Sequence, residues 1–230
     1  MSELFILRIV PEWGDDSNAI HPAVVRGGNC LALFDCGYVG SLPMIEAAMS
    51  EHNLSCLQLT HVVLTHHDHD HVGALAALKR KYPQVQIVSG RKEAAFIRGT
   101  KPALRLTQAR AMQPSLKGDA AAFGLKFIKM LEQLEPVDVD ITVEDGDILP
   151  ICGGVEALAT PGHTAGHTAY DLRALDVLIA GDAAVLEDGA LMLAYPQYAE
   201  DLSLAEQSYQ RILAHPARTI ICYHGGIFRR

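Results

Sequence analysis

The chain has 230 residues and a net charge of −8, with hydrophobic residues at 49% and charged residues at 20%. This composition predicts a folded protein with a sizeable core, and the negative charge disfavours nucleic acid as a partner. The sequence has no long apolar run and no basic segment before a cleavable apolar stretch, so neither a membrane span nor an export signal is expected. The five scattered cysteines are typical of reduced thiols in a cytoplasmic protein.

Predicted strands and helices alternate through the first part of the chain. Hydrophobic patterning predicts strands at residues 4–10, 30–37, 60–67 and 85–90. Between them, residues 41–52 are expected to form a helix that Ser41 could cap, and residues 72–82 a helix that Pro83 stops. This alternation is typical of an α/β protein.

The pattern changes between residues 92 and 136, where the chain is predicted to be mostly helical. Residues 91–129 hold nine basic and two acidic residues, so this window carries a charge of +7. Strand patterning returns at 137–143, 155–172 and 176–186, and again at 219–224. A helix at 203–215 is expected to open with a capping box of Ser203 and Glu206.

The most informative stretch is THHDHDHVG, Thr65 to Gly73, which directly follows a predicted buried strand. Its histidines and aspartates are good ligands for divalent transition metals. Further histidines and one aspartate also follow predicted strands and adjoin glycine: His163, His167, Asp182 and His224. Because one tetrahedral ion with an open position needs only three protein ligands, this set predicts two adjacent ions.

The order of these motifs resembles the metallo-β-lactamase-fold hydrolases, a superfamily that includes glyoxalase II and acyl-homoserine lactonases. The resemblance rests on Thr65–Gly73, Thr160–His167, Gly181–Asp182 and His224–Gly225, and the early Asp-x-Gly in Phe34–Gly37 also fits. It implies a single domain over residues 1–230, built as a four-layer αββα sandwich. It also implies that the helical insertion at about 92–136 forms a cap over the metal site.

The resemblance implies a ligand set for two divalent ions. The first ion would be held by His66, Asp68 and His163, the second by Asp70, His71 and His224, and Asp182 would bridge both. His67 and His69 then fall between ligand positions, and His167 is expected to support the loop. The family usually has histidine where this chain has Asp68. Zinc is the expected metal, because the order of affinities favours it over manganese and iron. Manganese and iron are alternatives, because the carboxylate of Asp68 would suit them.

Two adjacent divalent ions can share a water molecule and lower its pKa, which would provide a bridging hydroxide at neutral pH. We therefore expect a dinuclear metal-dependent hydrolase of an ester, thioester or lactone, with Asp70 passing a proton to the leaving group. The alternatives are a phosphodiesterase, an iron-dependent oxidoreductase of the flavodiiron or sulfur dioxygenase type, and a ligand sensor.

The charge of the insertion predicts the kind of partner. A positive cap near the metals would attract an anionic small-molecule substrate, and Arg98 and Arg105 are the expected contacts. No nucleic acid or membrane partner is expected, and a homodimer is left open.

Overall fold

The computed structural model describes residues 2–11 and 13–230, and its main strands form two six-stranded sheets. The N-terminal sheet contains, in spatial order, β1 (Ser2–Ile6), β2 (Ala23–Gly27), β3 (Cys30–Phe34), β4 (His61–Leu64), β5 (Gln86–Gly90) and β6 (Ile141–Val143). The C-terminal sheet runs in the order β14 (Gly226–Arg229), β13 (Thr219–Cys222), β10 (Val177–Gly181), β9 (Thr168–Leu172), β8 (Val155–Ala159) and β7 (Ile148–Leu149). A separate hairpin consists of β11 (Val185–Glu187) and β12 (Ala190–Met192).

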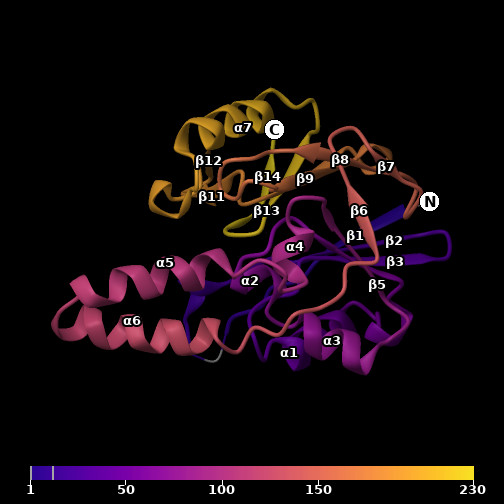
Figure 1. The fold of residues 1–230 in the computed structure, drawn as a ribbon. Helices are drawn as coiled ribbons and strands as arrows, with labels where there is room; N and C mark the ends of the chain where they lie inside the picture. The colour runs from indigo at the N-terminus through magenta and orange to yellow at the C-terminus, as the bar shows by residue number, and fades with distance from the viewer. Residues whose placement is uncertain (1, 12) are drawn as a thin grey trace.

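Helices cover the outer faces of both sheets (Figure 1). The N-terminal sheet is covered by α1 (Leu42–Glu51) and α3 (Leu75–Lys81), and the C-terminal sheet by α7 (Leu202–Ala214). The single turns α2 (His69–Val72) and α4 (Ala94–Ile97) lie nearer the middle, whereas α5 (Leu104–Met112) and α6 (Gly118–Leu131) form a hairpin that projects to one side. Short 3-10 turns lie at Asp16–Asn18, Cys56–Gln58, Gln113–Ser115, Arg173–Leu175 and Pro196–Tyr198.

Three hydrophobic clusters separate the four layers, because the side chains of a strand point alternately to its two faces. In β4, Val62 and Leu64 pack with the residues of α1 and α3, while Val63 packs between the two sheets. In β10, Ile179 packs between the sheets, while Leu178 packs with the residues of α7. The order of layers is helix, sheet, sheet, helix, which confirms the predicted αββα sandwich.

Some predicted elements differ from the observed ones. β2 and β14 were not predicted, and the strand expected at 137–143 begins only at Ile141. The helix expected at 72–82 is broken at Gly73, whose N–H donates to the Gly37 carbonyl at 2.7 Å instead of continuing a helix. A side chain at Gly73 would meet the Val39 backbone nitrogen at 2.2 Å, so this crossing of two loops requires glycine.

The chain carries five free cysteines, and four of them are buried. None of the described helices combines the length and the apolar character that a membrane crossing would need.

The start of α7 corrects the predicted capping box. The N-cap is Asp201, whose carboxylate accepts a hydrogen bond from the Leu204 N–H at 3.0 Å, while Ser203 already lies inside the helix. Aspartate satisfies a free N–H group and also carries a negative charge at the positive end of the helix dipole. Both effects favour Asp201 over Ser203.

We expect Asp201→Ala to lower the free energy of unfolding by about 1 kcal/mol, because the Leu204 N–H loses its partner. The matched change Ser203→Ala, in the same turn, should alter it by less than about 0.5 kcal/mol. Urea unfolding of both variants and the parent protein measures the difference. Equal losses for the two variants would show that Asp201 is not the cap.

Candidate metal centre

The ends of several strands meet at one edge of the sandwich. β3, β4 and β5 are parallel, so the loops that follow them leave from the same edge of the N-terminal sheet. In the C-terminal sheet, β10 and β13 are parallel, and the antiparallel β9 begins where they end. The segments Thr65–Gly73, Thr160–His167, Asp182 and His224 are therefore brought together although they lie far apart in the sequence.

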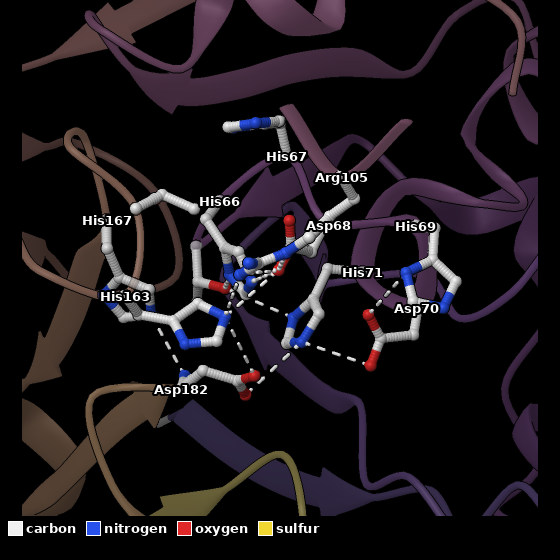
Figure 2. A network of polar contacts seen from close by, with 12 residues as sticks. His66, His67, Asp68, His69, Asp70, His71, Arg105, His163, His167 and Asp182 are labelled. Carbon is white, nitrogen blue, oxygen red and sulfur yellow. Dashed lines mark hydrogen bonds and ion pairs between the residues drawn. The ribbon is translucent and has the colours of Figure 1, made fainter. Parts of the chain in front are cut away.

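A first cluster of donor atoms contains His66, Asp68 and His163 (Figure 2). Asp68 Oδ2 lies 3.6 Å from His66 Nε2 and 3.1 Å from His163 Nε2. The same nitrogen of His163 also faces Asp182, whose Oδ2 lies 3.5 Å from it.

A second cluster contains Asp70, His71 and His224. Asp70 Oδ2 lies 3.2 Å from His224 Nε2 and 3.8 Å from His71 Nε2. Asp182 Oδ1 completes this cluster, 3.3 Å from His71 Nε2 and 3.6 Å from His224 Nε2. Asp182 thus directs one carboxylate oxygen to each cluster, as expected of a bridging ligand.

Both clusters fit divalent ions. A tetrahedral ion bound at about 2.1 Å by nitrogen and oxygen places its ligand atoms about 3.4 Å apart, close to the separations in both clusters. Several donor atoms are also buried without a hydrogen-bond partner: His66 Nε2, His71 Nε2, Asp68 Oδ1 and Asp182 Oδ1. Buried polar atoms left unpaired are costly, and metal coordination would satisfy them.

Asp35, at the end of β3, orients the second cluster. Its Oδ2 accepts a hydrogen bond from His71 Nδ1 at 2.9 Å, which directs His71 Nε2 toward Asp70 and Asp182. The carboxylate of Asp35 is itself fixed by Thr65, whose backbone N–H and hydroxyl donate at 2.9 and 2.8 Å. Carboxylates of this kind set the tautomer and direction of a ligating imidazole.

His167 supports the bridging residue and is not available as a ligand. Its Nε2 accepts a hydrogen bond from the Asp182 backbone N–H at 3.0 Å, and its Nδ1 lies 2.8 Å from the Thr160 hydroxyl. Both ring nitrogens are therefore in use, and burial lowers the pKa of His167 well below its ordinary value, so the ring is neutral.

His67 and His69 lie outside both clusters. His67 Nδ1 contacts the Glu93 carboxylate, and its ring stacks on Phe96 with centroids 4.2 Å apart, so it points away from the donor atoms (Figure 2). His69 Nδ1 lies 3.5 Å from Asp70 Oδ1, and its ring meets Phe127 of α6 edge-on.

The two arginines expected to bind substrate have different surroundings. Arg98 donates to the Val139 carbonyl on the body of the protein. Arg105, in the first turn of α5, is buried; its Nε donates to Asp68 Oδ2 at 2.8 Å, and its Nη2 lies 2.7 Å from the same oxygen. The insertion therefore reaches the candidate metal centre through Arg105, which contacts a carboxylate of the first cluster.

Comparison with known proteins identifies the family. The family model for the metallo-beta-lactamase superfamily matches residues 19–224. The chain belongs to the metallo-beta-lactamase superfamily. A superfamily member from Thermus thermophilus has a TM-score of 0.76 at 22% identity, with 98% of this chain and 74% of that chain covered. One from Sulfolobus tokodaii has a TM-score of 0.71 at 18% identity, with 98% and 81% covered.

Curated proteins that match in sequence include hydroxyacylglutathione hydrolases. The one from Mesorhizobium japonicum is 30% identical over 168 residues, which cover 72% of this chain and 48% of the relative. The one from Vibrio cholerae serotype O1 is 26% identical over 181 residues, which cover 76% of this chain and 54% of the relative. The chain thus spans about half the length of these relatives.

Two buried residues near the centre were not predicted. Glu93 accepts hydrogen bonds from the His67 N–H and the Thr164 hydroxyl, both at 2.9 Å, and so ties the cap to two loops of the metal centre. Tyr223 donates from its hydroxyl to the Asp70 carbonyl at 2.6 Å. In the sequence, Glu93 stood out only as one of two acidic residues in a basic window, and Tyr223 only as a neighbour of His224.

The ionisation of the cluster depends on neighbouring charges. Burial would raise the pKa of Asp68, but the adjacent His163 and His66 and the charge of Arg105 hold that pKa well below its ordinary value. Burial would likewise lower the pKa of His71, but three surrounding carboxylates raise it well above its ordinary value. The carboxylates of the centre therefore stay ionised, and their negative charge attracts cations. A metal ion that bound there would supply this positive charge and displace the protons of the imidazoles.

Two histidines of α2 offer a matched test of the ligand set. We expect His71→Ala to weaken zinc binding by at least about 100-fold. Removing a residue that hydrogen-bonds to a metal ligand already costs about 10- to 100-fold in affinity, and removing the ligand itself should cost more. His69→Ala, two residues earlier, should retain the zinc content of the parent. Elemental analysis after dialysis against a weak chelator measures both. Zinc loss in His69→Ala with retention in His71→Ala would place the ligands in another register.

The role of Asp35 has a separate test. Asp35→Asn removes the charge that holds His71, so zinc affinity should fall about 10- to 100-fold with the ligands themselves intact. Asp35 has a φ of 57°, which asparagine tolerates, so the backbone should not be strained. Asp176→Asn is the control, because Asp176 has a φ of 56° and pairs with Arg218 instead. Unchanged affinity in Asp35→Asn would contradict the orienting role.

Proposed function

We propose that this protein is a metal-dependent hydrolase of acyl thioesters. The observation that carries the proposal is the pair of donor clusters joined by Asp182, whose two oxygens face different clusters. Such a pair suits two adjacent divalent ions, with zinc as the proposed metal. Membership of the superfamily supports hydrolysis, and the name of the curated relatives, hydroxyacylglutathione hydrolase, supports a thioester as the bond cleaved.

Divalent ions bound at these clusters would lower the pKa of a water molecule and polarise the carbonyl group of the substrate. The chain itself contributes a carboxylate that can carry a proton. Asp70 is fixed through its backbone by Tyr223, its Oδ2 faces His224, and its Oδ1 faces His69. We propose that Asp70 moves a proton from the water to the leaving group.

The nature of the leaving group favours a thioester over an oxygen ester. A thiol has a pKa of about 8.5, so it departs as a thiolate with little need for a strong acid beside it. The pKa of Asp70 lies below its ordinary value, because nearby histidine charges outweigh the effect of burial. A carboxyl group that is ionised at neutral pH is a weak proton donor. A thiolate needs less protonation on leaving than the alkoxide of an oxygen ester, so it suits such a group better.

We also propose that the substrate is a small anion. Several cations of the basic window 91–129 are already paired: Arg105 with Asp68, Arg91 with Glu144 and Arg110 with Glu132. The lysines at positions 92, 101, 117, 126 and 129 are exposed, and together they give the cap its outward positive charge. These lysines would raise the local concentration of an anionic substrate in a manner that salt weakens.

Asp68 favours one second candidate, an iron-dependent oxidoreductase. A carboxylate in the first cluster suits iron better than a donor set made only of imidazoles. This candidate predicts oxygen-dependent turnover by the iron-loaded protein and no hydrolysis of thioesters.

The test compares a hydroxyacylglutathione with a matched oxygen ester, a lactone and a phosphodiester, using metal-free protein reloaded with zinc, manganese or iron. We expect the highest kcat/KM for the thioester, and at least about a 100-fold loss of kcat after chelation, because carbonyl polarisation is then missing. Restoration by the metal is the control for irreversible damage. Preferential cleavage of the phosphodiester, or turnover only with iron and oxygen, would refute the thioester proposal.

A further inference from the structure

Arg105 is a cation that the cap places inside the metal centre. It lies in the first turn of α5, at the base of the projecting hairpin, and only 8% of its surface is exposed (Figures 1 and 2). Its Nε and Nη2 lie 2.8 and 2.7 Å from Asp68 Oδ2, and its Nη2 lies 3.2 Å from His163 Nε2. The guanidinium therefore touches two of the three residues of the first cluster.

Arg105 contacts two atoms that could bind a metal ion, His163 Nε2 and Asp68 Oδ2, whereas Asp68 Oδ1 has no hydrogen-bond partner. His163 Nε2 has a single lone pair, which can accept a hydrogen bond from arginine or bind a metal ion, but not both. Asp68 Oδ2 could serve both cations, but a guanidinium 2.7 Å away would then lie beside a divalent ion and repel it. Arg105 and a metal ion are thus competitors for the first cluster.

The second cluster has no such competitor. In the described part of the chain, the ion pairs of Asp70 are with His69, His71 and His224 alone, and neither lysine nor arginine pairs with it. The two clusters share Asp182 and have similar spacings, and among the described residues only the first cluster has a contact with Arg105.

Arg105 is held in this position by more than Asp68. Its Nη1 donates to Gln108 at 3.2 Å, one turn further along α5, and its guanidinium carbon lies 5.8 Å from the centre of the Tyr198 ring. These contacts orient the planar group, so that both donors meet the carboxylate. The position of the Arg105 side chain is therefore fixed by contacts within and around the cap, in addition to its contact with Asp68.

Charge balance gives the same result. The three carboxylates of the ligand set are Asp68, Asp70 and Asp182, all of them buried, and Asp35 pairs with His71 outside this set. One divalent ion in the second cluster and the guanidinium of Arg105 together carry three positive charges, which neutralise them. A second divalent ion added with Arg105 in place would leave a buried excess of positive charge, which is unfavourable unless Arg105 leaves or an anion enters.

We infer that Arg105 is an internal competitor for the first metal site, which makes the two sites unequal in affinity. This inference rests on the metal centre of the proposed function and gives Arg105 a role other than binding substrate. The second cluster binds its ion tightly, and the first cluster binds only as Arg105 gives up Asp68 and His163.

The inference is tested by titrating metal-free protein with zinc. Calorimetry monitors the titration, and elemental analysis measures the bound zinc. The parent should show one tight and one weaker event, with Kd values at least about tenfold apart, and His163→Ala should abolish the weaker one. Arg105→Gln should tighten the weaker event by at least about tenfold and leave the tight one unchanged. Arg105→Lys retains the positive charge and should resemble the parent.

Arg110→Gln is the matched control, because Arg110 lies on the same helix and pairs with Glu132 on the surface. It should bind both ions as the parent does. Two equal sites in the parent, or an Arg105→Gln variant whose weaker event is unchanged or weaker still, would overturn the inference. The last of these results would mean that Arg105 assists metal binding by orienting Asp68.

The titration needs no substrate, so it separates this inference from the proposed function. If the parent cleaves no thioester but Arg105→Gln tightens the weaker site, the competitor role stands and the proposed reaction fails. If thioesters are cleaved and the affinities do not change, the reaction stands and the competitor role is refuted.

Discussion

Three buried carboxylates that meet between the ends of two sheets impose the main constraint on this protein. Asp68, Asp70 and Asp182 are 6%, 8% and 7% exposed, and their side chains face a common group of imidazoles. An ionised carboxylate removed from water is tolerated only when positive charge or hydrogen bonds compensate for the lost hydration. The surrounding histidines, Arg105 and the metal ions proposed here all answer this one requirement.

The sandwich supplies the rigidity that such a centre needs. Each ligand follows or precedes a strand whose two faces are buried, so its backbone is anchored in a packed layer rather than in a free loop. The loops are then joined to one another by buried polar contacts. Tyr223 joins the loop after β13 to Asp70, Asp35 joins the end of β3 to His71, and His167 holds the backbone of Asp182.

The sequence was sufficient for features that depend on neighbouring residues or on motif order. The buried strand β4 and the metal-binding character of Thr65–Gly73 follow from local pattern, whereas the four-layer arrangement came from the resemblance. Local pattern could not choose among the four histidines and two aspartates of residues 66–71, and the motif of the family was needed to select a register. The cap was predicted as helical, but not as a hairpin that projects from the body.

The sequence could not predict which polar side chains contact one another when they lie far apart along the chain. Arg105 and Asp68 are 37 residues apart, Glu93 and His67 are 26 apart, and Tyr223 and Asp70 are 153 apart. The same limit applies over short range where two residues compete, as when Asp201 caps α7 in place of Ser203. In each case the partner is decided by packing of whole elements, which local pattern does not contain.

Asp68 and Arg105 are best understood together, although each first stood out for a different reason. Asp68 stood out because the family that this chain resembles usually has histidine at that position. Arg105 stood out as a cation of the cap. With histidine at position 68, the guanidinium would face imidazoles with no carboxylate to pair with, and its burial would be costly. With aspartate, the pair is neutral and ties the start of α5 to the first cluster. Metal loading at that cluster and the seating of the cap are then linked, because an ion that takes His163 Nε2 from Arg105 removes one of the contacts that hold the start of α5.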